Sequence, residues 1–421
     1  MRKRTFQRRG SAYLLILGVA MLLTVIGVAS IFAVRAQREA ADMTNDAVKA
    51  RLYARSGIEV GLQRIATAPA WRTSHGEGTW YSDVALGDGT FTLEAHDLGP
   101  EGDLAMSSDG DPVLLIATGY KGDARHKLQV RLEAPPSDEP LTCLGSALHA
   151  GGDLEFTTAT VSSNGIISGN ADANADGGSV NAVVEVVGTA TGSTYTPAPT
   201  EGVEARTMPE ASVFDAYIAD GTAIALADIP SGTIEEVVLS PGMNPYGPGQ
   251  VDADGIYVID CQGNDVTIRN CRIVGTLVLL NAGAGSEVTG QLNWEPAVTN
   301  YPSLLVQGSL TATFSAWEVL NEGEWSVNFN PAHTPYEGQS DSDEDDIFPT
   351  ILKGLVYVSD DLSVDVNPAF DGSVIVGGAF SASGQAIFNY RSTFYADPPS
   401  GFAPCEGTMQ VVSGTWAQVV D

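Results

Sequence analysis

Oxygen-bearing side chains alternate along one short stretch of the chain, Asp172-Ala-Asn174-Ala-Asp176-Gly177. Carboxylate and amide oxygens at every second position converge on a calcium ion when the chain turns at the following glycine. We therefore expect Asp172, Asn174 and Asp176 to bind calcium in a structural role, and we expect no other cofactor. The twelfth position, where an EF-hand has a bidentate glutamate, is Val183, so a complete EF-hand is excluded. A plain turn is the alternative, because Asn and Asp beside Gly also form ordinary turns.

A second alternation of carboxylates, Asp341, Asp343 and Asp345, is a weaker calcium candidate because Asp346 occupies the glycine position. This acidic run belongs to a strand-poor segment, residues 336–349, which we expect to be an excursion on the surface.

Side chains suited to catalysis are scarce after residue 140. Glycoside hydrolases need a pair of carboxylates that act together. Asp360 and Asp361 are adjacent, but neighbours in a strand point to opposite faces, so a joint role would need a turn there. The sequence has no nucleophile elbow, phosphate-binding loop or dinucleotide fingerprint. We therefore expect no enzymatic activity. The basic and imidazole side chains in this part are His149, Arg206, Arg269, Arg272, His333, Lys353 and Arg391.

The four cysteines, Cys143, Cys261, Cys271 and Cys405, allow three pairings into two disulfides. Cys261 and Cys271 flank a single strand-turn-strand stretch, which favours a disulfide between these two. No CxxC pair occurs, so the sequence gives no support to a zinc site or a thioredoxin-like site.

The net charge of −31 is concentrated in the distal part of the chain. Residues 1–140 carry 16 Lys and Arg against 17 Asp and Glu, whereas residues 141–421 carry 5 against 35. A surface this acidic repels phosphates and anionic lipids, which excludes nucleic acid as a partner.

The element that must carry the rest of the chain is at the N-terminus. An uncharged run of 24 residues, rich in Leu, Ile, Val and Ala, extends from Ser11 to Val34. As a helix it would be roughly 36 Å long, enough to cross a bilayer. Five Lys and Arg precede the run, an excess typical of a cytoplasmic flank. The sequence predicts a single-pass inner-membrane helix over residues 11–34, with its N-terminus in the cytoplasm and the bulk of the chain outside.

Helical composition continues beyond the membrane segment. Residues 36–66 contain no Pro and only two Gly, and apolar residues recur there mostly at three- to four-residue spacing. We therefore predict a basic leader over residues 1–10 and one transmembrane and stalk helix over residues 11–68. Alternating strand patterns and Gly-containing turns then predict a small β-rich unit over residues 76–133, and three prolines mark a linker at residues 134–140.

Residues 141–421 consist of short β-branched runs separated by Gly, Asn and Asp. The segment Gly354-Leu-Val-Tyr-Val-Ser359 resembles Gly255-Ile-Tyr-Val-Ile-Asp260, as internal repetition would produce. These features favour a right-handed parallel β-helix as one acidic domain over residues 141–421. A β-sandwich or jelly roll is the alternative. The chain as a whole is predicted to be mainly β, with one long N-terminal helix.

The start of the chain resembles a type IV prepilin. The residues that carry the likeness are Arg8-Arg9-Gly10-Ser11-Ala12-Tyr13-Leu14-Leu15-Ile16-Leu17, a basic leader ending in Gly before an apolar helix. The resemblance implies cleavage between Gly10 and Ser11 by a prepilin peptidase. Major pilins have Glu at the fifth mature position, which here is Leu15; minor pilins of the PilX type and the type II secretion minor pseudopilin K also lack this Glu. An uncleaved signal anchor that never enters a filament is the alternative.

The resemblance implies a non-enzymatic minor pilin or pseudopilin in the bacterial inner membrane. Its partners would be other pilin or pseudopilin subunits, and its β-helix would serve filament tip assembly, secretion or adhesion at the cell surface. The alternative function is a membrane-tethered β-helix that binds or cleaves a surface polysaccharide, in which case Trp294, Trp317 and Trp325 would be platforms for sugar rings if they were exposed.

Overall fold

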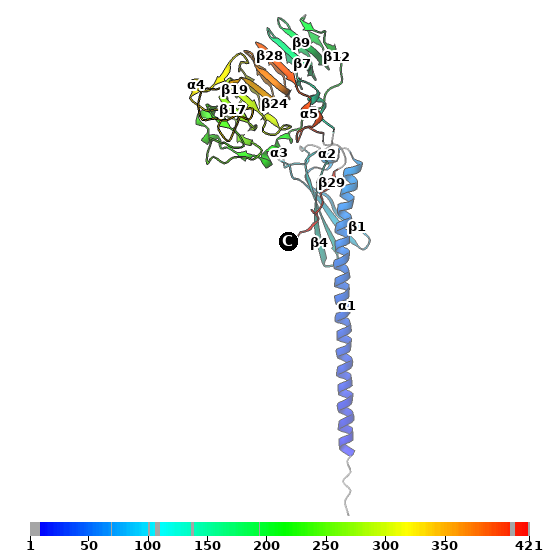
Figure 1. Ribbon diagram of the computed structural model, residues 1–421. Coiled ribbons are helices and arrows are strands. Elements are labelled where there is room, and N and C mark those ends of the chain that lie inside the picture. Colours follow the sequence, from blue (N-terminus) through cyan, green and yellow to red (C-terminus); the bar gives the residue numbers. More distant parts are fainter. Residues whose placement is uncertain are drawn as a thin grey trace, which may run out of the picture. The chain divides into compact units, whose positions relative to one another are not determined.

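The computed structural model describes residues 9–68, 70–99, 102–105, 110–135, 139–192, 194–404 and 409–419. The chain forms two compact units (Figure 1). The first unit is Met1–Pro135 together with Gly407–Asp421, and the second unit is Pro136–Glu406. The second unit is therefore inserted, in sequence, into the first.

The first unit is built on one long helix, α1 (Arg9–Thr67), which agrees with the helix predicted over residues 11–68. Its C-terminal half buries Ala50, Ala54 and Ile58, which recur at four-residue spacing and so share one face. A short helix, α2 (Trp71–His75), follows.

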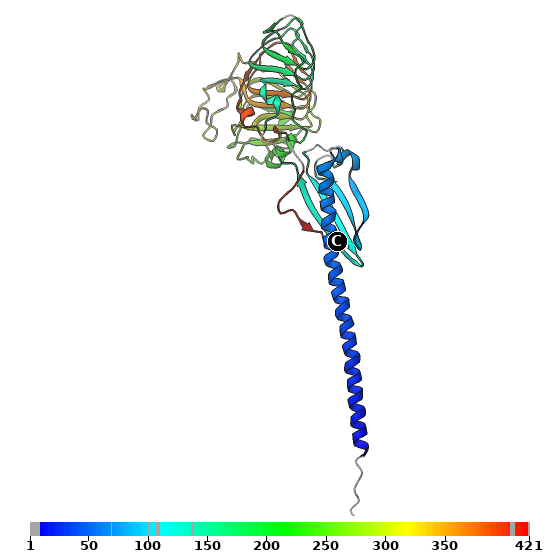
Figure 2. The ribbon, with the colours of Figure 1, turned by 90° about the vertical axis from the view of Figure 1, so that its right-hand side faces the viewer.

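An antiparallel sheet covers the buried face of α1 (Figure 2). Its four long strands lie within the β-rich unit predicted over residues 76–133, and they pair in sequence order. These strands are β1 (Gly78–Leu86), β2 (Gly89–Asp97), β3 (Val113–Lys121) and β4 (Ala124–Glu133). Phe91, Leu93, Leu115, Ala117 and Val130 are buried between the sheet and the helix. The alternation of buried and accessible positions in β2 and β3 is that of a sheet with one face on a core.

The C-terminal residues correct one predicted boundary. We expected residues 141–421 to form a single domain, but β29 (Gln410–Val411) and β30 (Ala417–Gln418) both pair antiparallel with β4 in the first unit. These strands have two residues each, too short for an alternating pattern, and their partner lies almost 300 positions away in the sequence. No local signal could therefore have assigned them.

The Asp88 carboxylate ties the turn between β1 and β2 to α1. It accepts a hydrogen bond from Lys49 Nζ at 2.8 Å and another from the Tyr53 hydroxyl at 2.6 Å. Lys121 Nζ lies 3.2 Å from the same carboxylate. These donors, Lys49 first and then Tyr53 and Lys121, hold the pKa of Asp88 well below its usual range.

The Asp88→Asn variant is expected to be less sensitive to acid than the wild type. Because the pKa of Asp88 is depressed in the folded state, its contribution to stability is present above the ordinary Asp pKa of about 3.9 and is lost as the pH falls toward the folded-state pKa. The side chain is 54% exposed, so solvent screening keeps the effect small. Thermal unfolding at pH 7 and pH 3 measures it, and an equal fall in Tm for both proteins would contradict this role of Asp88.

The second unit is dominated by a 22-stranded sheet in which all pairings between the described strands are parallel. Parallel pairing of this kind does not fit the antiparallel β-sandwich or jelly roll. The strands are β5 (Leu148–Ala150), β6 (Leu154–Glu155), β7 (Thr160–Gly169), β8 (Ala173–Asn174), β9 (Ser179–Val186), β10 (Ala190–Thr191), β11 (Tyr195–Thr196), β12 (Thr200–Glu201), β13 (Thr222–Ala223), β14 (Thr233–Glu235), β15 (Val238–Leu239), β16 (Ile256–Asp260), β17 (Thr267–Val274), β18 (Thr276–Leu280), β19 (Glu287–Glu295), β20 (Pro302–Val306), β21 (Leu310–Ala312), β24 (Ile351–Val358), β25 (Leu362–Val364), β26 (Ala369–Val376), β27 (Phe380–Ala382) and β28 (Gln385–Tyr390).

Buried apolar residues stack in a column through this unit. Eight strands each contribute one residue to this column, and each residue is paired in register with the next one. All eight belong to one hydrophobic core: Tyr257, Leu277, Leu304, Val356, Val374, Leu148, Ile167 and Val184. Each successive layer thus buries an apolar side chain on the one before it, which is how stacked repeats stabilise one another.

The order of the layers differs from the order of the sequence. β5 pairs with β26, and β7 pairs with β28, so residues 148–201 stack on the last layers of the unit rather than on residues 222–260 (Figure 1). After β12 the chain runs through α3 (Val213–Asp220), and β13 then pairs with β16 in the layers that follow. The aromatic residues Phe214 and Tyr217 of α3 are buried in a second cluster with Tyr357 and Phe402.

Short helices and one surface excursion, residues 319–349, complete the unit. A two-stranded antiparallel pair, β22 (Val319–Asn321) with β23 (Ile347–Pro349), encloses α4 (Glu322–Trp325) and a long loop. The excursion has its own small core of Leu320, Phe329 and Phe348, to which Val238 contributes. The remaining helical segments are η1 (Thr142–Gly145), η2 (Leu226–Asp228), η3 (Pro230–Gly232) and α5 (Thr393–Ala396).

Candidate functional site

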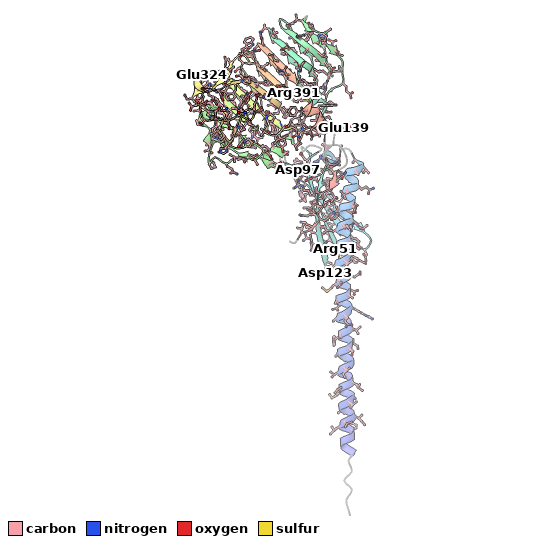
Figure 3. All side chains as sticks on the ribbon, in the orientation of Figure 1. Arg51, Asp97, Asp123, Glu139, Glu324 and Arg391 are labelled. Carbon is pink, nitrogen blue, oxygen red and sulfur yellow. The ribbon has the colours of Figure 1, made fainter. Side chains whose placement is uncertain are left out.

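The N-terminal half of α1 exposes its apolar side chains. Between Tyr13 and Val34 the large apolar residues are between 47% and 70% exposed, and the stretch stands clear of the rest of the first unit (Figure 3). Among the described residues this is the one helix long and apolar enough to cross a membrane. So large a continuous apolar surface indicates burial against lipid or against other apolar helices.

The predicted cleavage site lies at the start of this helix. Gly10 and Ser11 both belong to the first turn of α1, which begins at Arg9. Residues 1–8 of the predicted leader and the side chains of residues 9–12 lie outside the described part of the chain.

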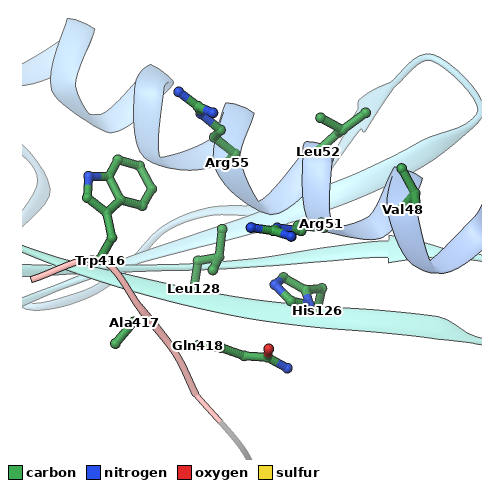
Figure 4. A pocket seen from close by; sticks show the side chains of 9 residues that line it. All are labelled: Val48, Arg51, Leu52, Arg55, His126, Leu128, Trp416, Ala417 and Gln418. Carbon is green, nitrogen blue, oxygen red and sulfur yellow. The ribbon is translucent and has the colours of Figure 1, made fainter.

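A groove of about 670 Å³ follows α1 where the helix begins to pack on the sheet (Figure 4). One wall is α1, the floor is β4, and the other wall is the C-terminal segment that pairs with β4. Its lining residues are Val48, Arg51, Leu52, Arg55, His126, Leu128, Trp416, Ala417 and Gln418.

The four-residue spacing on α1 gives this groove both an apolar and a cationic character. Val48 and Leu52 form one such pair, and Arg51 and Arg55 form the other, so all four lie on adjacent faces of the helix. Leu52 is 56% exposed and Trp416 is 40% exposed. The Arg55 guanidinium carbon lies 6.0 Å from the centre of the Trp416 ring, at the limit of a cation–π contact.

The environment of His126 disfavours the charged form of its imidazole. Burial lowers the pKa of His126, and the charge of Arg51 lowers it further. Its Nε2 atom is buried and has no hydrogen-bond partner among the described residues. The groove thus presents two guanidinium groups beside exposed apolar side chains, and Arg55 also lies 4.0 Å from the Glu59 carboxylate one turn along the helix.

The predicted calcium residues lie on an extended corner of the second unit. Asp172 precedes β8, Asn174 ends it, and the chain turns only afterwards, at Asp176 and Gly177. Side chains two apart on a strand point the same way but stay roughly 7 Å apart, too far to share one ion without a turn between them. Among the described residues, no group of three or more His, Cys, Asp or Glu is arranged to hold a metal ion.

Aspartate oxygens of this stretch form hydrogen bonds with the neighbouring layers. Asp172 Oδ1 accepts hydrogen bonds from the backbone N–H of Thr189 at 2.6 Å and from its hydroxyl at 3.1 Å. Asp153, one layer away, accepts from the backbone N–H of Asp172 at 3.1 Å. Asp361 makes the same contact with the N–H of Ala379 at 2.8 Å. In each of these three cases, an aspartate at the corner of one layer thus accepts a hydrogen bond from a backbone N–H of the next layer.

Asp172→Ala is expected to lower the stability of the second unit by about 1 kcal/mol, the typical net loss for an intramolecular hydrogen bond. Asp172→Asn keeps an acceptor oxygen and should cost less. Thermal unfolding with and without calcium chloride distinguishes Asp172 as a hydrogen-bond acceptor from Asp172 as a metal ligand. A stabilisation by calcium that disappears in both variants would identify Asp172 as a metal ligand instead.

The three cysteines in the described part of the chain are not paired. Cys261 and Cys271 are free thiols buried in the core of the second unit, and the disulfide that their spacing favours is not formed there. Burial raises the pKa of Cys271 to about 12, so the thiol stays protonated. Cys143 is also free and buried, and Cys405 lies outside the described residues.

The Lys and Arg side chains of the second unit have acidic partners. All five of its Lys and Arg form ion pairs: Arg206 with Glu185, Arg269 with Glu235, Arg272 and Lys353 with Glu295, and Arg391 with Asp371. His149 is fully buried and bonds to the Ser168 hydroxyl at 2.8 Å. Of the three tryptophans considered as sugar platforms, Trp294 is buried, Trp325 is partly buried, and Trp317 is 72% exposed.

Comparison with known proteins gives little further identification. No protein-family model matches the chain, and no curated protein matches it either. Among solved structures, the crystal structure of the competence-associated pilin ComZ from Thermus thermophilus is similar to 89% of this chain and 98% of its own, with 11% sequence identity and a TM-score of 0.35. These values are too low to establish a shared fold or function.

Proposed function

We propose that this protein is a non-enzymatic, membrane-anchored subunit of the pilin type that displays a right-handed parallel β-helix outside the membrane. The observation that carries the proposal is the division of α1. Its first half exposes apolar side chains along Tyr13–Val34, whereas its second half is buried on an antiparallel sheet. One continuous helix thus anchors the chain in lipid and forms part of a soluble fold.

The dimensions of the helix agree with this role. The exposed stretch Tyr13–Val34 is roughly 33 Å long at the ordinary helical rise, close to the thickness of the hydrocarbon core. Arg35, Arg38 and Glu39 follow it directly and mark where the helix meets water. The leader, which resembles that of a prepilin, precedes this stretch and would direct the chain to the membrane. The prepilin peptidase would cleave between Gly10 and Ser11.

The groove beside α1 supports contact with neighbouring subunits. Its residues come from the half of the helix that emerges from the membrane, where helices of adjacent subunits would pass. In this role Arg51 and Arg55 would pair with an acidic residue of a neighbour, and Leu52 and Trp416 would be covered by its apolar side chains.

We place the subunit at a filament tip rather than in a shaft. The second unit spans residues 136–406, a large volume to repeat at every position of a shaft. Leu15 at the fifth mature position, in place of Glu, agrees with a minor pilin of the PilX type or a type II secretion pseudopilin K. Secretion and surface adhesion are the two roles that such a tip would serve.

The absence of an enzymatic role is part of the proposal. Each of the five Lys and Arg in the second unit forms an ion pair that supports the fold. Asp361 accepts a hydrogen bond from a backbone N–H of the neighbouring layer. The alternative, a tethered polysaccharide-binding or polysaccharide-cleaving protein, would use the second unit without any filament.

Filament incorporation distinguishes these roles. Surface filaments are sheared from cells that express the tagged full-length protein and are separated from membranes by centrifugation. A tip subunit is expected in the sheared fraction at low copy number together with other pilin subunits, and it should be absent from that fraction when the prepilin peptidase is deleted. Recovery in the membrane fraction alone, in both strains, would contradict the proposal.

A further inference from the structure

Four neighbouring layers of the second unit carry polar side chains at the same corner. The strands β16, β18, β20 and β24 stack in parallel register, and each contributes one residue to a buried column: Ile259, Leu279, Val306 and Val358. Within two residues of each of these, a side chain with an amide, hydroxyl or carboxylate group follows: Asp260, Asn281, Gln307, Ser359 and Asp360. Because neighbouring strands lie roughly 4.8 Å apart, these side chains form a row about 14 Å long across the layers.

Two hollows lie along this row. The first has a volume of about 750 Å³, and its polar lining consists of Asp228, Asp260, Gln262 and Asn264. The second has a volume of about 540 Å³, lies beside α3, and has as its polar lining Asn281, Gln307, Ser359 and Asp360. Asn281 donates from Nδ2 to Asp260 Oδ1 at 3.1 Å, so the two hollows adjoin. We call them together the polar trough.

Small side chains keep the polar trough open. Ala223, Ala225 and Ala227 form a wall of the first hollow, and all three are exposed. The aromatic rings of Phe214 and Tyr357 line the second hollow but are only 3% and 4% exposed. The rings therefore form the base of the trough and do not project into it.

Some polar atoms of the trough are held by hydrogen bonds, and others are free. Gln307 Oε1 accepts from the backbone N–H of Asn281 at 3.2 Å, and Ser359 Oγ accepts from the N–H of Gly308 at 2.9 Å. Within the described residues, Gln307 Nε2, Asn281 Oδ1 and the Asp228 carboxylate make no hydrogen bond. The trough thus offers a donor and several acceptors on fixed side chains, and a hydroxyl group can bond to both kinds.

The charge of the trough selects against anions. Three carboxylates line it, those of Asp228, Asp260 and Asp360, and its lining residues include no Lys or Arg. The five Lys and Arg of the second unit pair with acidic residues outside the trough. A polymer that carries phosphate, sulfate or carboxylate groups would therefore be repelled.

An added peptide strand does not fit the trough either. β16 pairs with β13 and β18, β18 also with β20, β20 also with β24, and β24 also with β26. Each of the four strands is therefore paired on both sides, and none has an open edge for a backbone ladder. The trough can recognise a chain through side chains alone, which suits rings that carry hydroxyl groups.

We propose that the polar trough binds a neutral polysaccharide, whose successive sugar units lie along the row from Asp260 to Asp360. The free amide and carboxylate groups bond to its hydroxyl groups, and the small side chains leave room for its rings. The adhesive purpose of the trough rests on the proposed function, since a subunit at a filament tip would use such a surface to attach to a cell. Binding itself requires no filament.

Calorimetric titration of the full-length protein, in micelles of a detergent without sugar groups, tests the proposal. The probes are linear oligosaccharides of glucose, mannose, galactose or N-acetylglucosamine, with oligogalacturonate as the anionic comparison. At least one neutral probe is expected to bind saturably, and oligogalacturonate should bind about tenfold or more weakly.

Two variants locate the binding site. Ala225→Trp fills the first hollow from an exposed position and should weaken binding by about tenfold or more. Its matched control is Ala396→Trp, which places the same ring on an exposed position of α5 outside both hollows and should bind as the wild type does.

Gln307→Glu tests one hydrogen bond. It keeps the oxygen that accepts from the N–H of Asn281 but replaces the free donor Nε2, and it should weaken binding by about fivefold to tenfold. Gln385→Glu on β28 adds the same charge outside the trough and serves as the control.

Three results would overturn the proposal. These are the absence of saturable binding by every neutral probe, equal binding by Ala225→Trp and Ala396→Trp, and binding of oligogalacturonate as tight as that of the neutral probes. Entry into filaments is measured separately. A protein that binds a neutral probe but enters no filament would contradict the proposed function alone, and one that enters filaments but binds no probe would contradict the role of the trough alone.

Discussion

Replacing Gly119 by alanine is expected to disrupt the packing of α1 on its sheet and to destabilise the first unit by about 3 kcal/mol or more. Gly119 lies in β3 where the strand meets the helix. A methyl group there would collide with the backbone oxygen of Ala50 and the backbone nitrogen of Ala54. Both obstacles are main-chain atoms of a rigid helix, so the side chain cannot be accommodated without moving α1 away from the sheet.

Gly61→Ala is the matched control for this substitution. A methyl group at Gly61 would meet only the ends of Leu115 and Leu93, at 3.0 Å from each, and leucine side chains can shift. Alanine also favours the helix over glycine by about 1 kcal/mol, which offsets the crowding. Hydrogen exchange of the β3 amides in the full-length protein reports on this packing. Equal protection in Gly119→Ala and the wild type would contradict the close approach of helix and strand.

Arginine at both Leu22 and Val25 is expected to remove the protein from the membrane. These residues are 61% and 66% exposed near the middle of the apolar stretch of α1. One arginine at the centre of a transmembrane helix costs about 2.5 to 3.5 kcal/mol on insertion scales, so two cost on the order of 6 kcal/mol. We expect at least a tenfold reduction of the protein that stays in membranes after alkaline carbonate extraction.

Leu52→Arg is the control, because it adds an arginine to the same helix outside the apolar stretch. Leu52 belongs to the same helix and is 56% exposed, but it lines the groove beyond the apolar stretch. Membrane retention should be unchanged in this variant. If the double arginine variant stayed in membranes to the same extent as Leu52→Arg, then Tyr13–Val34 would not be the membrane anchor.

The N-terminal helix and the existence of most strands were predictable because their signals are local. The uncharged run from Ser11 to Val34 is long enough to cross a bilayer. Of the apolar residues that recur along the stalk, Ile58 and Ile65 are buried, whereas Val48 and Leu52 are exposed. The apolar run at residues 113–120, inside the unit predicted to be β-rich over residues 76–133, forms β3. In each case neighbouring residues in the sequence decide the structure.

The order of layers and the C-terminal strands were not predictable because they depend on distant partners. Nothing in β5 indicates that it stacks on β26, more than 200 residues later, because stacked layers share one pattern of buried and exposed residues. The role of Asp172 also depends on a distant partner. An aspartate that bonds to the next layer and an aspartate that opens a calcium loop have the same local sequence, so the hydrogen bond to Thr189 could not be foreseen, and calcium binding by Asp172, Asn174 and Asp176 stays a prediction.

The groove also assembles from distant segments. The groove brings Arg51 of α1, His126 of β4 and Trp416 of the C-terminal segment together.

The mature N-terminus is the measurement that tests the central claim most directly. The full-length protein is isolated from membranes of cells with and without the prepilin peptidase, and its N-terminal peptide is identified by mass spectrometry. A pilin-type subunit is expected to begin at Ser11 in the first strain and to retain residues 1–10 in the second. An intact leader in both strains, or trimming that does not require the peptidase, would contradict the account and leave a tethered protein that enters no filament.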